Sequence, residues 1–339
     1  MSRTMPVEVV YFGKLPSRGD FVRNGDADGL TRRLDQWLTQ GLELMARDAR
    51  WKEVYDQAGG FSFAFLGVRQ RALVAGHLLA SADASGRRFP FVAVGQLAVD
   101  SPLAFMQRAP MALAGLWRDL AQRAEAAHAA DDAVPVLNQL NEWRAQVETD
   151  PAAFEAGYRD FLELQTIGSL QALLQQAEPG TDLRRTLLAL GLLLQPVPAS
   201  GANRLEKGLR LPLPADPALQ AYAATWWLDL VGRFLARGDF EVGVFLPRGT
   251  GTGGGTGTGT DSVAPSLAVG FSGDAPSLLH AALDRAAADD HFVDLFAPEW
   301  VEEPAEQDYA VRKLGSYLQQ PPLSLAQARA TFNEAFLGE

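Results

Sequence analysis

The sequence predicts an α/β protein built on a mixed sheet, with an extra helical region in the middle of the chain. Strand-like apolar runs lie in both the N-terminal and the C-terminal parts of the 339 residues, with a long stretch of helix-forming residues between them. A five-residue connection, 67–71, joins two of the runs and suits a hairpin, so that pair is expected to be antiparallel. The composition, 47% hydrophobic and 21% charged, is that of an ordinary globular protein.

The N-terminal part alternates between the two periodicities. Residues 30–45 place Leu, Trp and Met at helical spacing, which predicts one amphipathic helix. Short apolar runs bounded by turn residues predict four strands, at residues 7–12, 61–66, 72–79 and 91–99.

Residues 102–200 are rich in Ala, Leu, Gln, Arg and Glu, and prolines divide this segment into about four predicted helices. We expect one domain over residues 1–339, with 102–200 as a helical insertion or subdomain, because the later strands need a sheet to join. Further strands and helices follow, with strands predicted at 208–213, 240–246 and 266–271, helices at 218–236 and 276–288, and two short helices around residues 321–322. The Trp226-Trp227 pair on the first of these helices is expected to be mostly core.

Charge and composition exclude several classes of function. A net charge of -11 without any dense Lys/Arg run argues against nucleic acid and anionic membrane surfaces as partners. The absence of cysteine removes disulfides, thiolate zinc sites and cysteine nucleophiles, and the four histidines show no metal-ligand spacing. We therefore expect no cofactor and no metal. With no leader and no apolar run near the ~20 residues of a membrane span, we expect a cytoplasmic protein without membrane insertion.

The glycine-rich run at residues 249–260 invites comparison with phosphate-binding loops. Gly249, Gly251 and Gly254 have the spacing of a dinucleotide fingerprint, but the run leads into a predicted strand instead of a helix. No Gly-Lys-Ser/Thr follows it either. Alternating Gly/Thr tracts are typical of linkers, so residues 249–262 are predicted to be a flexible loop.

Two polar loops remain as the candidate site. The first contains Lys14, Ser17, Arg18 and Asp20 between the pairs Tyr11-Phe12 and Phe21-Val22, whose aromatic residues we expect to be buried. The second contains Ser81, Asp83, Arg87 and Arg88. Loops that leave neighbouring strands can meet at one sheet edge. The cluster is then either a recognition surface or anion site, or an ion-paired network that closes the end of the sheet.

The same two loops carry a family resemblance. The run GKLPSRGDFV at residues 13–22 and the run SADASGRRFPF at residues 81–91 resemble the TagF/ImpM family of type VI secretion-associated proteins, over roughly residues 7–125. The resemblance implies a three-layer α/β/α fold without established catalytic activity. It also implies a cytoplasmic, negative post-translational regulator of type VI secretion assembly, whose partner is the system's forkhead-associated-domain scaffold protein.

Three functions therefore compete. The first is a non-enzymatic regulator that binds the scaffold and keeps it from assembly. The second is a small-anion or nucleotide-binding α/β enzyme, with Asp20 or Asp83 as the base and Arg87 or Arg88 holding the anion; it requires a deep pocket beside the loops and a carboxylate with a perturbed pKa. The third is an architectural role in the secretion baseplate.

Overall fold

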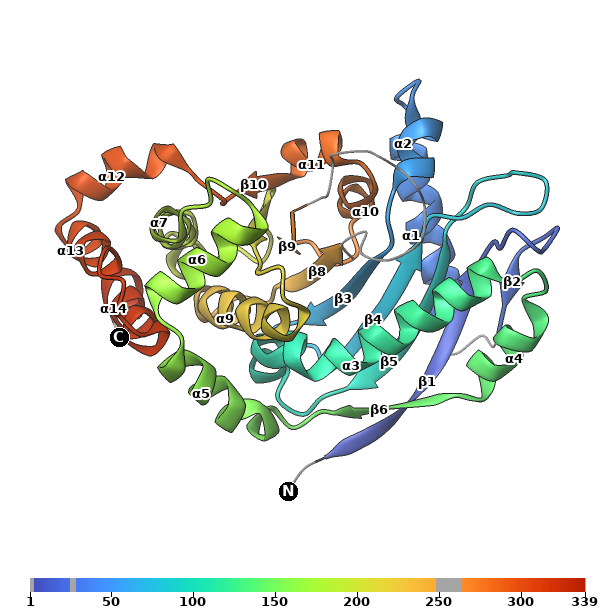
Figure 1. Cartoon of the computed structure of the whole chain (residues 1–339), viewed down its shortest axis with the longest axis horizontal. Coiled ribbons are helices and arrows are strands. Elements are labelled where there is room, and N and C mark those ends of the chain that lie inside the picture. The colour runs from blue at the N-terminus through green and yellow to red at the C-terminus, as the bar shows by residue number, and fades with distance from the viewer. Residues whose placement is uncertain (1–2, 25–28, 248–263, 339) are drawn as a thin grey trace.

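A large mixed sheet organises the molecule in the computed structural model, which describes residues 3–24, 29–247 and 264–338 (Figure 1). Within these residues ten strands join in the order β10-β7-β9-β8-β3-β4-β5-β1-β2, with β6 paired to β1. All pairs are antiparallel except β10 with β7. The strands are β1 Thr4–Gly13, β2 Val22–Arg23, β3 Phe61–Gly67, β4 Ala72–Leu79, β5 Phe91–Ala98, β6 Arg144–Glu148, β7 Gly208–Pro212, β8 Glu241–Pro247, β9 Ser266–Gly270 and β10 Phe292–Asp294.

Helices cover both faces of the sheet, so the three-layer α/β/α arrangement is confirmed (Figure 1). One face packs against α1 Leu30–Met45, α2 Trp51–Gln57, α10 Pro276–Leu283 and α11 Arg285–His291. The other face packs against α3 Pro102–Ala129 and α9 Pro217–Leu235. The predicted helix 276–288 is two helices, because the Asp284 carboxylate accepts the Ala286 N–H at 2.9 Å and starts a new helix there.

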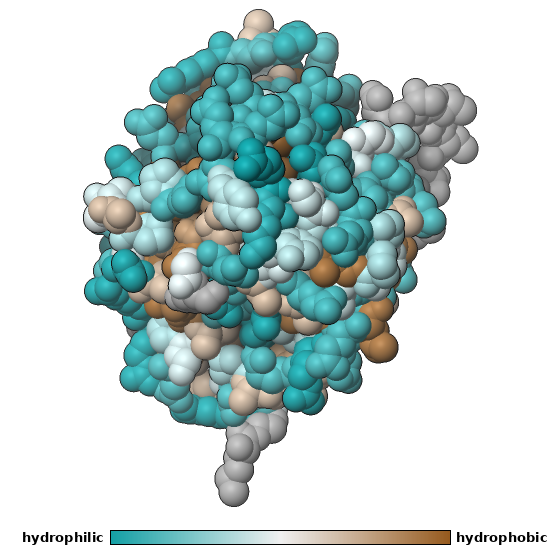
Figure 2. All heavy atoms as spheres, turned by 90° about the vertical axis from the view of Figure 1, so that its left-hand side faces the viewer, coloured by the Kyte–Doolittle hydropathy of each residue, from teal (hydrophilic) through white to brown (hydrophobic). Residues whose placement is uncertain are grey.

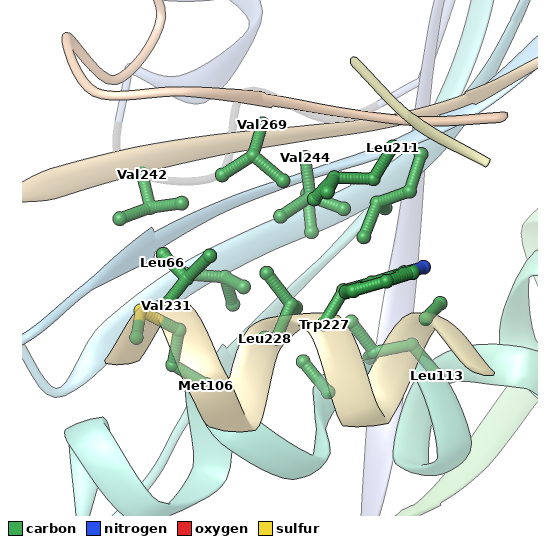
Figure 3. Packing of buried hydrophobic residues seen from close by; sticks show 14 of the residues in the cluster. Leu66, Met106, Leu113, Leu211, Trp227, Leu228, Val231, Val242, Val244 and Val269 are labelled. Atoms are coloured by element: carbon green, nitrogen blue, oxygen red, sulfur yellow. The ribbon is translucent and has the colours of Figure 1, made fainter. Parts of the chain in front are cut away.

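The α9 face holds the larger of the two hydrophobic clusters. Trp227, Leu228 and Val231 point from α9 to the valines of β8 and β9 (Figure 3). The Trp227 indole Nε1 donates to the Pro212 carbonyl at 2.9 Å, which satisfies its one polar group inside the core. Trp226 and Trp227 are both fully buried, as predicted.

The segment 102–200 does not form one separate body. Its first helix, α3, lies on the sheet, and β6 joins the edge of the sheet by pairing with β1. This strand was not expected among helix-forming residues. Its five residues alternate between exposed and buried, a period-2 pattern too short to stand out from its surroundings.

From residue 151 on, that segment lies beyond α9 together with the C-terminal helices (Figure 1). Backbone hydrogen bonds tie the two parts: Ile167 N–H donates to Leu323 O at 2.8 Å, and Leu325 N–H donates to Gln165 O at 2.9 Å. The helix α4 Val134–Glu142 lies apart from them, near β1. The elements beyond α9 are η1 Pro151–Phe154, α5 Glu155–Leu164, α6 Ile167–Ala177, α7 Leu183–Leu194, α8 Val197–Ser200, η2 Glu299–Val301, α12 Glu302–Gln307, α13 Tyr309–Leu318 and α14 Leu325–Leu337.

The surface over α12–α14 is mainly hydrophilic, with hydrophobic side chains in small separate groups (Figure 2). In the parts of the chain that the structure describes, no helix combines the length and apolar character that crossing a bilayer requires. The predicted Gly/Thr loop, residues 249–262, lies outside the described residues.

Candidate functional site

The two polar loops meet beside the ends of β1 and β4 and form one unit, which we call the loop corner (residues 13–21 and 81–90). The Ala84 N–H donates to the Arg18 carbonyl at 2.8 Å, and the Arg87 guanidinium donates to the Gly19 carbonyl at 2.8 Å. From the second loop, the Ser81 hydroxyl also donates to the Lys14 carbonyl at 2.7 Å. These cross-loop hydrogen bonds hold the backbones of the two loops against each other.

Gly13 shows why the first loop begins with glycine. Its φ of +136° is a conformation that residues with a side chain rarely adopt. A Cβ at this position would overlap the carbonyl oxygen of Pro90 in the second loop. Only glycine lets the two chain segments approach so closely at the start of the corner.

Asp83 is the centre of the corner, and its carboxylate is completely buried. One oxygen accepts from the Ser85 hydroxyl at 2.7 Å and from the backbone N–H groups of Ser85 and Arg87, both at 3.0 Å. The other oxygen accepts from Arg87 Nε at 2.7 Å and faces the Lys14 ammonium at 3.0 Å. Every contact of this carboxylate comes from the corner itself.

The pKa of Asp83 reflects this environment. Burial raises it, but the hydrogen bonds from Ser85, Arg87 and Lys14 together outweigh burial and hold the pKa well below the usual range. The charged form is therefore the one that the fold stabilises. A carboxylate with a depressed pKa and no exposed surface is not suited to act as a general base at neutral pH.

This depressed pKa predicts a loss of stability in acid. The stabilisation from Asp83 is complete above the ordinary aspartate pKa of 3.8 and is lost as the pH falls from there through the lower folded pKa. The free energy of unfolding, measured by urea titration between about pH 5 and pH 2, should fall less steeply in Asp83→Asn than in the wild type. Equal slopes in the two proteins would contradict this assignment.

Three predicted members of the cluster do not join it. The side chain of Arg18 is exposed and makes no hydrogen bond or ion pair with any described residue, and Asp20 caps only the Phe21 N–H, at 2.8 Å. Arg88 turns away and forms a two-fold contact with Asp56 on α2. The prediction that Asp20 and Arg88 lie in one cluster with the other polar side chains was therefore wrong. Ser17 lies in the first loop, and its buried hydroxyl has no hydrogen-bond partner among the described residues.

Phe21 corrects a further expectation. Tyr11 and Phe12 are buried as predicted, but the Phe21 side chain is 43% exposed. Its ring stacks on Phe12 at 5.4 Å, meets Phe89 edge-on at 4.9 Å and lies 4.9 Å from the Lys14 ammonium. Neighbouring residues of extended chain point to opposite sides, so Phe21 and Val22 could not both face the core. That alternation was the signal available in the sequence.

Tyr55 on α2 is a supporting residue that the sequence pattern did not single out. Its hydroxyl donates to the Ser81 carbonyl and accepts from the Ser81 N–H, both at 2.9 Å. Burial raises the pKa of this hydroxyl, so it stays neutral and keeps both bonds. No sequence motif marked it, because α2 is a short helix remote from both loops in the chain.

No described cavity opens onto the corner. Cavities of about 280 and 230 Å³ lie elsewhere, the first beside α1 and the second beside β7 and β10, and neither is lined by corner residues. In residues 3–24, 29–247 and 264–338, no group of three or more His, Asp or Glu side chains is placed to hold a metal ion. Neither of these two cavities belongs to the corner, whose loops are joined by hydrogen bonds at the surface.

A second buried polar group, centred on Asp229 of α9, was not anticipated. Its carboxylate accepts from Arg329 at 2.9 Å, from the Tyr158 hydroxyl at 3.1 Å and from Arg108 at 3.2 Å. Arg108 also donates to Glu155 at 2.8 Å. The four helices α3, α5, α9 and α14 thus meet at one carboxylate. The sequence offered no signal for it, because these residues are far apart along the chain.

Comparison with known proteins places both loops in one family domain. Residues 10–143 match the model of the TagF N-terminal domain, which is type VI secretion system-associated. Among solved structures, the crystal structure of PA0076 from Pseudomonas aeruginosa PAO1 is 25% identical, with a TM-score of 0.34; the match covers 39% of this chain and 60% of that one. No curated protein matches the chain. Residues 10–143 of this chain therefore form a TagF N-terminal domain, a domain associated with the type VI secretion system.

Proposed function

We propose that this chain is a non-enzymatic, cytoplasmic regulator of type VI secretion system assembly. It acts as a post-translational repressor by binding the forkhead-associated-domain scaffold of the system, and the loop corner is the surface that docks the scaffold. The family match supports the secretion-system context. The observation that carries the docking surface is Phe21, an exposed aromatic ring held rigidly between Phe12 and Phe89.

Aromatic and arginine side chains dominate the binding energy of protein interfaces, above all where they are fixed in advance. Beside Phe21, Arg18 offers a guanidinium that no described residue engages, and the Arg87 side chain is 62% exposed although it bonds Asp83. The corner thus presents one aromatic ring and two cations on a backbone fixed by cross-loop bonds. Such a surface suits a partner with carboxylate or phosphate groups around an apolar contact.

The enzyme alternative finds no support in the corner. Of its two proposed bases, Asp83 is fully buried and saturated with hydrogen bonds, and Asp20 lies apart from the cluster and accepts from the Phe21 N–H. Of its two proposed anion holders, Arg87 is bound to the Asp83 carboxylate and Arg88 is bound to Asp56. The deep pocket that this alternative requires is not among the described cavities.

The docking proposal predicts selective loss of binding. Arg18→Ala and Phe21→Ala should each weaken the affinity for the purified scaffold protein by about tenfold or more, because each removes an exposed anchor. Titration calorimetry with the full-length chain measures this directly. Leu164→Ala is the control, since Leu164 is 79% exposed on the remote helix α5.

Folding must be checked in the same variants. The Arg18 side chain contacts no described residue through a polar bond, so Arg18→Ala should keep the wild-type unfolding midpoint. Wild-type affinity in both folded variants would overturn the corner as the docking surface. Absence of binding in the wild type would overturn the choice of partner.

A further inference from the structure

The 280 Å³ cavity beside α1 is a groove at the end of the sheet, which we call the α1 groove. Three elements form its walls: the first turns of α1, the hairpin that joins β3 to β4, and the turn that precedes α10. Its lining includes Arg33, Phe65, Val74, Gln96, Glu241 and Asp274. None of them belongs to the loop corner.

The floor of the groove is a part of the sheet that α1 leaves uncovered. The Phe63 ring lies 5.2 Å from that of Trp37 of α1, and Phe63 and Val94 are both fully buried. One register step along the strands, Phe65 and Val74 pair across β3 and β4, and both are only half-buried. Trp37 meets the Phe65 ring edge-on at 5.1 Å and so closes one end of this apolar floor.

The rim carries charges that the fold does not neutralise. Glu241 and Asp274 are both exposed, and neither forms an ion pair with any described residue. Among the described residues, the Glu241 carboxylate accepts a hydrogen bond only from the Gln70 amide. By contrast, Asp56 and Glu302 each pair with arginine. Arg33 stands on the helix side, also without an ion pair in the described residues. Gln96 adds an amide beside Val74.

The volume restricts what can enter. The groove has a volume of about 280 Å³. Sites for drug-sized ligands and cofactors have volumes of about 300 to 1,000 Å³, so the groove is slightly too small for them. It has room for one large side chain and for parts of the residues next to it in a bound segment. A second copy of this chain is disfavoured, because each copy carries a net charge of -11.

We propose that the α1 groove binds a peptide segment of a partner protein, in which an aliphatic or aromatic side chain lies next to lysine or arginine. The apolar side chain covers Phe65 and Val74, and the cation faces Glu241 and Asp274. The Arg33 guanidinium donates to a carbonyl or carboxylate oxygen of the same segment from the opposite side. This site is separate from the loop corner, and it stands whether or not the corner binds the scaffold.

The test uses the purified full-length chain and a library of random linear peptides displayed on phage. Peptides selected on the wild type should pair an aliphatic or aromatic residue with Lys or Arg. A synthetic peptide of the selected sequence should bind about tenfold or more weakly to the double variant Glu241→Lys/Asp274→Lys. The matched control, Asp35→Lys/Glu43→Lys, makes the same charge change on the outer face of α1 and should bind as the wild type does.

Two further variants keep the test decisive. Asp274→Lys alone removes no hydrogen bond or ion pair of the described residues, so it will fold even if the double variant does not, and it should also weaken binding. Val74→Asp places a charge on the floor and should abolish binding of the apolar side chain. Selection of acidic peptides, or unchanged affinity in the folded variants, would overturn the proposal. Neither result would bear on Arg18 and Phe21, which lie outside the groove.

Discussion

Replacing Asp229 by alanine is expected to lower the free energy of unfolding by about 3–5 kcal/mol, because it removes the buried carboxylate that faces Arg108 and leaves this buried cation only the half-exposed Glu155. Asp229 is 2% exposed and Arg108 is 7% exposed, so water cannot take the place of the lost carboxylate. Arg329 and Tyr158 lose an acceptor at the same time. The change should loosen α5 and α14 from α9, which this carboxylate joins.

Urea unfolding followed by circular dichroism measures this loss. A double variant, Asp229→Leu/Arg108→Met, should recover part of it, because replacing a buried ion pair by apolar residues costs less than removing one partner. If the free energy of unfolding of Asp229→Ala lies within about 0.5 kcal/mol of the wild-type value, the network does not hold these helices together.

Replacing Gly13 by alanine should lower the free energy of unfolding by about 3 kcal/mol or more, because the costs of backbone strain and of steric overlap add to each other. The residue combines a φ of +136° with direct apposition to Pro90. The alanine methyl can be accommodated only if β1 moves away from the second loop. We therefore expect lower thermal stability together with weaker scaffold binding, since the loop corner depends on that approach.

Gly19→Ala is the matched control for this effect. Gly19 lies in the same loop, but a Cβ there would meet no atom within 4 Å. Its unfolding midpoint should stay close to that of the wild type. A Gly13→Ala protein as stable as Gly19→Ala would show that the two loops are not held by close backbone contact.

The sequence predicted most of the sheet because its strands follow simple patterns. The runs that became β3, β4 and β5 are apolar and bounded by turn residues, and the hairpin between β3 and β4 follows from its short connection. The helix α9 was also predictable, since Asp216 and Pro217 mark its start. By contrast, β6 and α2 are short and carry no strong periodic signal.

The meeting of the two loops was predictable, but the role of each side chain was not. The choice of Asp83 as the buried centre depends on Ser81, Ser85 and Lys14 arriving from two loops at once. The pairing of Arg88 with Asp56 depends on α2, which was not predicted. Long-range partners of this kind, including those of Asp229, are fixed by tertiary packing and leave no local trace in the chain.

The fold explains how the corner can act as a fixed surface. Lys14 and Asp83 form a buried ion pair beneath Phe21, and Tyr55 anchors Ser81 from α2. Groups that are already ordered lose little conformational entropy when a partner docks. The buried Asp83 carboxylate holds the two loops in place through its hydrogen bonds. The exposed Phe21 ring above it is then available to a partner.

Hydrogen–deuterium exchange of the full-length chain, with and without the purified forkhead-associated-domain scaffold, tests the central claim most directly. Binding at the loop corner predicts slower exchange of the backbone amides of residues 14–24 and 81–91 in the complex, with little change over α12–α14. A complex that forms with unchanged exchange in both loops and new protection elsewhere would contradict the corner as the docking surface.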